Sequence, residues 1–135
     1  MSFETRQRLQ RFIRRRPALA DTPLLIVEGK PLSPREALEH LERREMVEQV
    51  SMKMEKLRLA APIIQEELWL LTEEHYRRLL QLPPPRIAIF IMSQQKKYRF
   101  TLEECLEEVE KRTPFGKKLA ENHQKLILQM VEWMQ

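Results

Sequence analysis

The sequence predicts a mainly α protein with a minor β element, a helical bundle of about five helices with one or two short strands or a hairpin. Two helix-capping motifs, a long apolar repeat at spacings of three and four residues, and the presence of only two glycines predict this class. So few glycines argue against a turn-rich β sandwich and against a glycine-built phosphate loop. The chain has 135 residues, 42% of them hydrophobic and 33% charged, which suits one globular domain with its own core.

Residues 1–20 are predicted to form a basic N-terminal helix or arm, followed by a single helical domain over 21–135. A thin apolar stripe among many arginines predicts a helix over 2–16, and Pro17 ends it because proline disfavours the α conformation of the preceding residue. Six arginines against one glutamate give residues 1–20 a net charge of +5, whereas 18 basic and 19 acidic residues leave 21–135 at −1. The net charge of +4 therefore belongs to the first segment.

A short apolar run at Leu24–Val27 predicts a buried strand that ends in a tight turn at Glu28–Gly29. Ser33 follows as an N-cap, with Pro34 at the first helical position and Glu36 three residues after the cap. In such a capping box the serine hydroxyl accepts a hydrogen bond from the glutamate N–H, and the glutamate carboxylate accepts one from the serine N–H. This pattern, with proline where no N–H is needed, predicts a helix that begins at residue 34.

A stripe of apolar residues follows along the middle of the chain, at alternating spacings of three and four over about three and a half heptads. Pro62 lies inside this helical pattern, so we expect a kink or a break near residue 61. Such a narrow stripe suits packing against one other helix, either in a protein partner or second copy, or in the chain's own C-terminal segment. The residues predicted to form the partner interface are Val47, Val50, Met54, Leu57, Ile64, Leu68 and Leu71.

The segment Leu82–Pro85 ends the helical pattern with three consecutive prolines. The run Ile87–Met92 is β-branched and aromatic, which favours a strand, and residues 93–96 could turn it back into a hairpin. A buried helix over 86–96 is the alternative, because periodicity does not separate the two for so short a run. If the run is a strand, pairing with Leu24–Val27 would join the two halves of the chain in one sheet.

Two further helix starts are predicted in the last third of the chain. Thr101 begins another capping box, and Thr113 before a proline predicts a last helix that runs to about Met134. Residues 32–44 and 100–112 also resemble each other, with five identities at an offset of 68 residues. Either a strand–turn–helix unit is duplicated, which would place a binding groove between the halves, or both segments are simply capped acidic helices.

The arginine-rich N-terminus is the main candidate for a ligand site. Guanidinium groups bind phosphate through paired hydrogen bonds and release counterions from nucleic acid, and an anionic membrane surface would attract the same charges. The remaining interpretation is a solvated helix whose arginines pair with acidic neighbours in the fold or in a partner subunit. The residues predicted to bind nucleic acid or another anion are Arg6, Arg8, Arg11, Arg14, Arg15 and Arg16.

Two histidines fall on the inner sides of predicted helices. His75 lies one heptad after Leu68, and His123 lies inside the stripe of the last helix, so the two side chains could meet. A nearby glutamate could complete a metal site, but the sequence has no Glu-x-x-His, His-Glu-x-x-His or His-x-x-x-His spacing. We therefore expect hydrogen-bonded core histidines and no metal site.

The sequence also lacks a recognisable centre for catalysis. Cys105 is the only cysteine, so an intramolecular disulfide is excluded, and a reducing, cytoplasmic location fits best. Its place on an amphipathic helix predicts a small buried hydrophobe. We expect no catalytic residues, no cofactor and no enzymatic activity. The longest apolar run, Ile87–Met92, is too short for a transmembrane segment.

These observations favour a non-catalytic helical adaptor, assembly factor or regulatory subunit that acts through helix–helix contacts with a protein partner or as a homodimer. The alternative is a nucleic-acid-binding regulator that holds phosphates with the arginine helix. An adaptor should expose a contiguous apolar face. Trp69 and Trp133 lie beside the apolar stripes; burial in the core is the simpler interpretation, and exposure would indicate an interface anchor.

Overall fold

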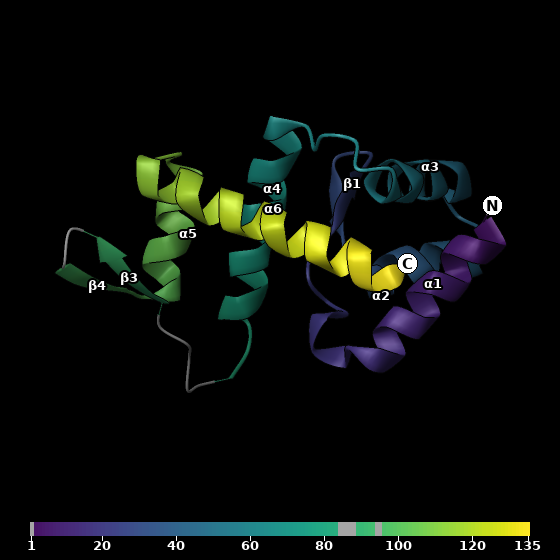
Figure 1. Cartoon of the computed structure of the whole chain (residues 1–135), viewed down its shortest axis with the longest axis horizontal. Coiled ribbons are helices and arrows are strands. Elements are labelled where there is room, and N and C mark those ends of the chain that lie inside the picture. Colours follow the sequence, from purple (N-terminus) through teal and green to yellow (C-terminus); the bar gives the residue numbers. More distant parts are fainter. Residues whose placement is uncertain (1, 84–88, 94–95) are drawn as a thin grey trace.

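The computed structural model describes the backbone of residues 2–83, 89–93 and 96–135 and the side chains of 2–83 and 100–135. In these ranges the chain forms six α-helices and two short β hairpins, so the predicted mainly α class is confirmed (Figure 1). The longest helix, α6, contacts α5 and α4 in one part of the molecule and α3 and α1 in the other. The helices are α1 (Ser2–Arg15), α2 (Pro34–Glu42), α3 (Val47–Arg58), α4 (Gln65–Leu80), α5 (Leu102–Glu110) and α6 (Pro114–Met134), with a short 3₁₀ turn at Pro17–Leu19.

The β element consists of two separate antiparallel hairpins. β1 (Leu25–Val27) pairs with β2 (Lys30–Leu32). β3 (Ile89–Ser93) pairs with β4 (Lys96–Phe100), so this part of the chain is the predicted strand and hairpin and not the alternative helix. Residues 87–88 of the predicted strand and 94–95 of the predicted turn lie outside the described residues.

The expected pairing of Leu24–Val27 with Ile87–Met92 is wrong, because the first strand is paired with the residues that follow it directly. Glu28 and Gly29 have φ values of 51° and 78°, as the type I′ two-residue hairpin turn requires. Closing so short a loop costs less chain entropy than joining strands roughly sixty residues apart. The tight turn that the sequence indicates therefore decides the strand's partner.

The predicted helix starts are all present. Ser33 Oγ accepts a hydrogen bond from Glu36 N at 3.2 Å, and Glu36 Oε1 accepts one from Ser33 N at 2.9 Å. Thr101 and Glu104 form the same reciprocal pair, with both distances at 3.1 Å. Thr113 Oγ1 accepts from the backbone N–H three residues later at 3.0 Å. Each bond satisfies a helix N-terminal N–H group that has no partner within the helix.

The middle of the chain forms three helices, where the sequence pattern predicts one long helical stretch. Arg44 and Met46 have φ values of 59° and 51°, and this left-handed turn separates α2 from α3. The break expected near residue 61 is confirmed: it separates α3 from α4, with Ala60 at φ 58° and Pro62 two residues later. The apolar stripe is therefore divided between two helices that run in different directions (Figure 1).

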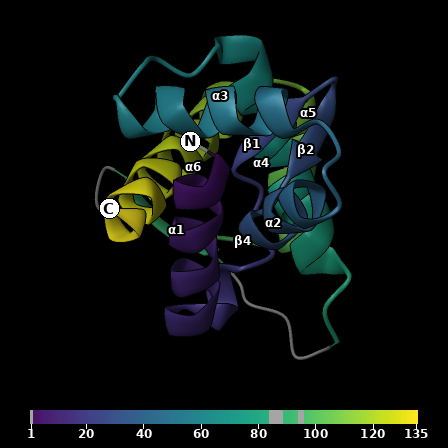
Figure 2. The ribbon, with the colours of Figure 1, turned by 90° about the vertical axis from the view of Figure 1, so that its right-hand side faces the viewer.

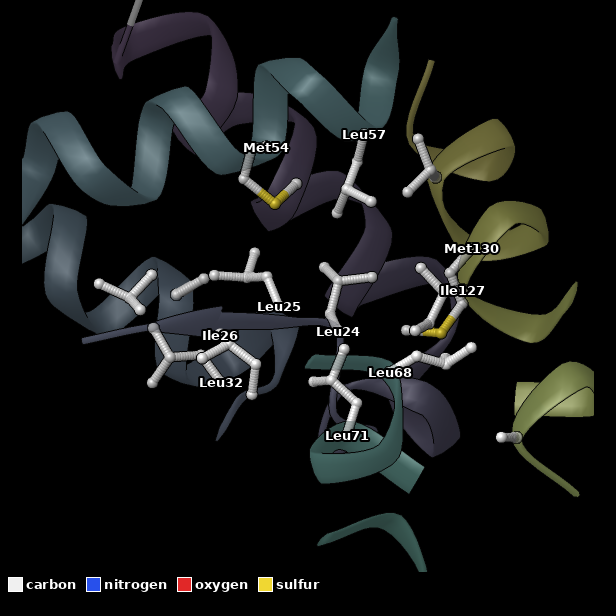
Figure 3. Packing of buried hydrophobic residues seen from close by; sticks show 14 of the residues in the cluster. Leu24, Leu25, Ile26, Leu32, Met54, Leu57, Leu68, Leu71, Ile127 and Met130 are labelled. Atoms are coloured by element: carbon white, nitrogen blue, oxygen red, sulfur yellow. The ribbon is translucent and has the colours of Figure 1, made fainter. Parts of the chain in front are cut away.

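The core is built around residues 24–27, all of which are buried. Figure 3 shows Leu24 among Leu57 of α3, Leu71 of α4 and Ile127 of α6. β1 contacts both α3 and α4. Burying an aliphatic side chain contributes roughly 1.5–3 kcal/mol, so this short segment is a major contributor to stability.

α1 packs as part of this folded body. Leu9 and Phe12 are 0% and 2% exposed. The helix contacts α2, α3 and α6, and Figure 2 shows it lying beside them. The predicted N-terminal helix is thus held in place by its own apolar stripe, with its polar side facing out.

The two halves of the chain contain the same order of elements. Helix, hairpin, helix and helix follow one another as α1–β1–β2–α2–α3 and again as α4–β3–β4–α5–α6. α2 and α5 are each nine residues long and are each followed by an arginine with positive φ, Arg44 at 59° and Arg112 at 54°. α1 contacts α2 as α4 contacts α5. The resemblance of 32–44 to 100–112 is therefore accompanied by a similar conformation that extends past both helix ends.

Gly116 allows α5 and α6 to approach closely, and we predict that Gly116→Ala destabilises the protein. An added Cβ would lie 2.2 Å from the carbonyl oxygen of Glu108, which is backbone and cannot rotate away. The helices would have to separate, at a cost of about 1–3 kcal/mol that exceeds the gain of about 0.5–1 kcal/mol from replacing a helical glycine. Urea denaturation measures the change, with the exposed neighbour Lys117→Ala as control. An unchanged or higher midpoint for Gly116→Ala would contradict the close approach.

Candidate functional site

The arginines of the N-terminal segment lie on the outside of the molecule. Thr5, Leu9 and Phe12 direct one side of α1 into the core, and the opposite side faces solvent. Arg11, Arg14 and Arg15 are exposed. The other members of the predicted site are Arg16, which is also exposed, and Arg6 and Arg8, which are half-buried.

These six arginines differ from most arginines elsewhere in the fold in having no carboxylate partner within the described residues. Arg35, Arg58, Arg77, Arg78 and Arg112 each pair with an aspartate or glutamate. The interpretation that the N-terminal arginines are neutralised within the fold therefore has support only at Arg8, whose charge acts on Glu55. Their charge remains available to an external anion.

Arg8 is the member of the group that lies closest to other charges. It lines a small cleft together with Glu55 and Arg58 of α3. The hydrogen bond from Arg58 is the main cause that lowers the pKa of the Glu55 carboxyl, and the charge of Arg8 adds to it. We therefore place the centre of the candidate anion site on Arg11, Arg14 and Arg15.

Arg16 connects the end of the N-terminal segment to the last helix. Its guanidinium carbon lies 3.5 Å from the ring centroid of Trp133, which is 38% exposed. A cation stacked on an indole face is attracted by the ring quadrupole. Trp133 thus holds the C-terminal side of the arginine segment against α6, while Trp69 is buried in the core.

The structure places most of the predicted partner-interface residues inside the chain's own core. Val50, Met54 and Leu57 of α3 and Leu68 and Leu71 of α4 are buried, because both helices turn this side towards β1. The other two residues of the stripe lie outside the core: Val47 is half-buried, and Ile64 is 60% exposed at the start of α4. Of the two arrangements that the stripe allows, packing within the chain is the one observed.

The opposite side of α3 carries exposed apolar residues that the repeat does not include. Met52 and Leu59 are 53% and 65% exposed. They border a hollow of about 530 Å³ that also involves Val47 and Ser51. Met52 and Leu59 are seven residues apart, so the sequence alone places them on one side of a helix. The longer apolar stripe from Val47 to Leu71 indicates the opposite side of α3 as the contact side.

A second, smaller cavity of about 240 Å³ lies where the two halves of the chain meet. β1, α3, the connection over 61–64 and the start of α4 enclose it. The ion pair from Lys53 Nζ to Glu67 Oε1, at 2.8 Å, stands at its edge and joins α3 to α4. The cavity is mainly apolar and lies in the region between the halves where the duplicated unit would place a groove.

His75 and His123 meet inside the protein, as their positions on the helices predict. Their ring centroids are 4.7 Å apart. His123 Nε2 donates a hydrogen bond to the carbonyl oxygen of Pro23 at 3.0 Å, and its Nδ1 is buried without a partner among the described residues. A carbonyl oxygen can only accept, so Nε2 of His123 carries a proton.

Burial keeps both histidines uncharged. Burial lowers the pKa of His75 to about 4. Burial also lowers the pKa of His123 to about 3, with a further contribution from repulsion by His75. The pair therefore acts as a structural contact between α4, α6 and the segment before β1 at neutral pH.

The described residues contain no group of three His, Cys, Asp or Glu side chains that could hold a metal ion. Cys105 is buried, and burial raises the pKa of its thiol to about 11, with Glu104 and Glu108 adding to the effect. Its thiol stays protonated at neutral pH, whereas a nucleophilic cysteine needs the thiolate.

Comparison with protein-family models, curated proteins and solved structures gave no match to this chain. Among the described helices, none combines the length and the apolar character that crossing a bilayer requires.

We predict that the histidine pair makes stability depend on pH between about 6.5 and 4. Because the folded protein lowers both pKa values below that of an unfolded histidine, the unfolded chain takes up protons first, and stability falls as the pH drops through this range. At about 1.4 kcal/mol per pH unit, each histidine removes at most about 2 kcal/mol between pH 7 and pH 5.

Urea denaturation at the two pH values measures this slope. His123→Gln can still donate to Pro23 but does not titrate, so it should flatten the slope although it lowers stability at pH 7. Asn122→Gln is the matched control, because Asn122 is an exposed, non-titrating neighbour of His123 on α6, and it should leave the slope unchanged. A slope in His123→Gln equal to that of the wild type would show that other groups cause it.

Proposed function

We propose that this protein is a non-catalytic regulator that binds the phosphate backbone of nucleic acid through α1. The observation that supports this proposal is the set of arginines of α1 that face solvent and have no carboxylate partner in the described part of the chain. Arginine binds phosphate in a paired, planar geometry, and each neutralised phosphate releases counterions.

The arrangement of these arginines suits a linear polyanion. Arg11, Arg14 and Arg15 lie within five residues, or about 6 Å along the helix axis, so their guanidinium groups can reach neighbouring phosphates at the same time. α1 is already folded and packed on α2, α3 and α6, so binding does not have to order the helix. The resulting contact is electrostatic and independent of base sequence.

An adaptor that acts through helix–helix contacts is the second candidate. The stripe on which that hypothesis was based lies mostly in the core, but the exposed side of α3 supports the same class of function. Apolar residues exposed together on one helix side are typical of protein interfaces. The two candidates use different surfaces and can be tested separately.

We predict that replacing Arg11, Arg14 and Arg15 together with alanine weakens nucleic-acid binding. Fluorescence anisotropy with a short labelled DNA duplex measures affinity between about 50 and about 200 mM salt. The wild type should bind with a steep dependence on salt, and the triple variant should lose at least about tenfold in affinity and about 3 in the slope of log K against log salt.

The control variant replaces three exposed lysines of α6 with alanine: Lys117, Lys118 and Lys125. It changes the net charge by the same amount as the triple arginine variant. It should retain most of the affinity if binding is localised on α1. Equal losses in both variants would indicate a non-specific charge effect, and no binding at low salt would exclude the proposal. Binding to anionic vesicles but not to DNA or RNA would assign the same arginines to a membrane surface instead.

A further inference from the structure

The exposed side of α3 has the properties of a surface that binds a second copy of the same chain. We infer that two copies associate by packing this side of α3 against itself in antiparallel orientation, with the twofold axis at Met52. This inference uses a different surface from the arginines of α1 and does not depend on nucleic-acid binding.

The first observation is the distribution of apolar residues on α3. One side of the helix buries Val50, Met54 and Leu57 in the core. The opposite side carries Met52, and Leu59 follows as the C-cap residue of α3; both are more than half exposed. Residues seven apart lie on the same side of a helix, two turns from each other. α3 is therefore apolar on two sides, of which the chain itself covers only one.

The second observation is the hollow next to these residues. It has a volume of about 530 Å³, and Val47, Ser51, Met52 and Leu59 border it, with Ser2 of α1 at its edge. A hollow of this size can receive the large side chains of a facing helix, as in the ridge-and-groove packing of helix pairs. The protruding Leu59 and the hollow together form a surface with both a projection and a recess.

The third observation is the pattern of charge, which is complementary to itself. Glu48 lies four residues before Met52, and Lys56 lies four residues after it. Neither has an ion-pair partner within the described residues, whereas Glu55 on the same side pairs with Arg58. When two such helices run antiparallel about an axis at Met52, Glu48 of each copy faces Lys56 of the other.

This symmetry favours a second copy over an unrelated partner. A twofold interface needs a surface in which each residue meets its complement when the surface is rotated onto itself. The order acid, methionine, base at equal spacing meets that condition in the antiparallel direction, while a parallel arrangement would bring like charges together. In the antiparallel register Leu59 of one copy approaches the Val47 end of the other copy's hollow.

Analytical ultracentrifugation of the full chain tests the inference. The apparent mass should rise with concentration from 16.3 kDa towards twice that value. Met52→Glu should raise the dissociation constant at least about thirtyfold, because it places two carboxylates together at the axis. The exposed Leu128→Glu on α6 is the matched control and should leave the dissociation constant unchanged.

The charge variants provide the sharper test. Glu48→Lys alone and Lys56→Glu alone should each weaken association about tenfold, because each converts two facing pairs into like charges. The double variant E48K/K56E restores both pairs and should return to within about threefold of the wild type. Circular dichroism checks that every variant keeps its helical content.

Three results would overturn the inference. The first is a chain that stays monomeric at about millimolar concentration, where even a weak helix pair should associate. The second is a dimer that is unaffected by Met52→Glu, which would use another surface. The third is a double charge variant that is no tighter than the single variants, which would exclude the antiparallel register.

Discussion

The burial of residues 23–27 is the constraint on which the rest of the structure depends. Four consecutive aliphatic side chains, Leu24–Val27, are almost fully removed from water between α3 and α4. At roughly 1.5–3 kcal/mol each, they contribute an upper bound of roughly 6–12 kcal/mol, which is comparable to the net stability of a whole domain. The carbonyl oxygen of Pro23 also fixes His123 of α6, so one segment holds three helices.

The polar contacts between the halves of the chain explain why the arginines of α1 remain available. Arg78 of α4 reaches Glu36 of α2 at 2.8 Å and donates to the backbone oxygen of Asp21 at 2.9 Å. Lys53 pairs with Glu67 across the break between α3 and α4. These contacts engage charged residues of the other helices, whereas α1 buries Leu9, Phe12 and Thr5. The exposed arginines of α1 take no part in these contacts between the halves.

The sequence predicted the local structure well because local structure depends on residues a few positions apart. Ser33, Thr101 and Thr113 mark helix starts through hydrogen bonds to backbone groups three residues away. The break near Pro62 is also a local effect, because proline disrupts the helix at its own position. In the candidate site, the concentration of arginine in residues 1–20 is a property of composition, and the inward positions of His75 and His123 follow from helical periodicity.

Only the tertiary structure decided which surfaces face solvent. An apolar stripe shows that a helix side is buried, but not whether another chain or the same chain covers it, and here α3 and α4 turn theirs onto β1. The exposed position of Met52, the separate hairpins and the unpaired arginines likewise depend on how distant segments come together. The sequence by itself therefore determined the class of fold, the helix starts and the location of the charge, since these depend on neighbouring residues. Which side of each helix is buried was decided by the tertiary structure, because burial depends on contacts between residues far apart in sequence. Left-handed turns such as those at Met46 and Ala60 set the directions of the helices that make these contacts.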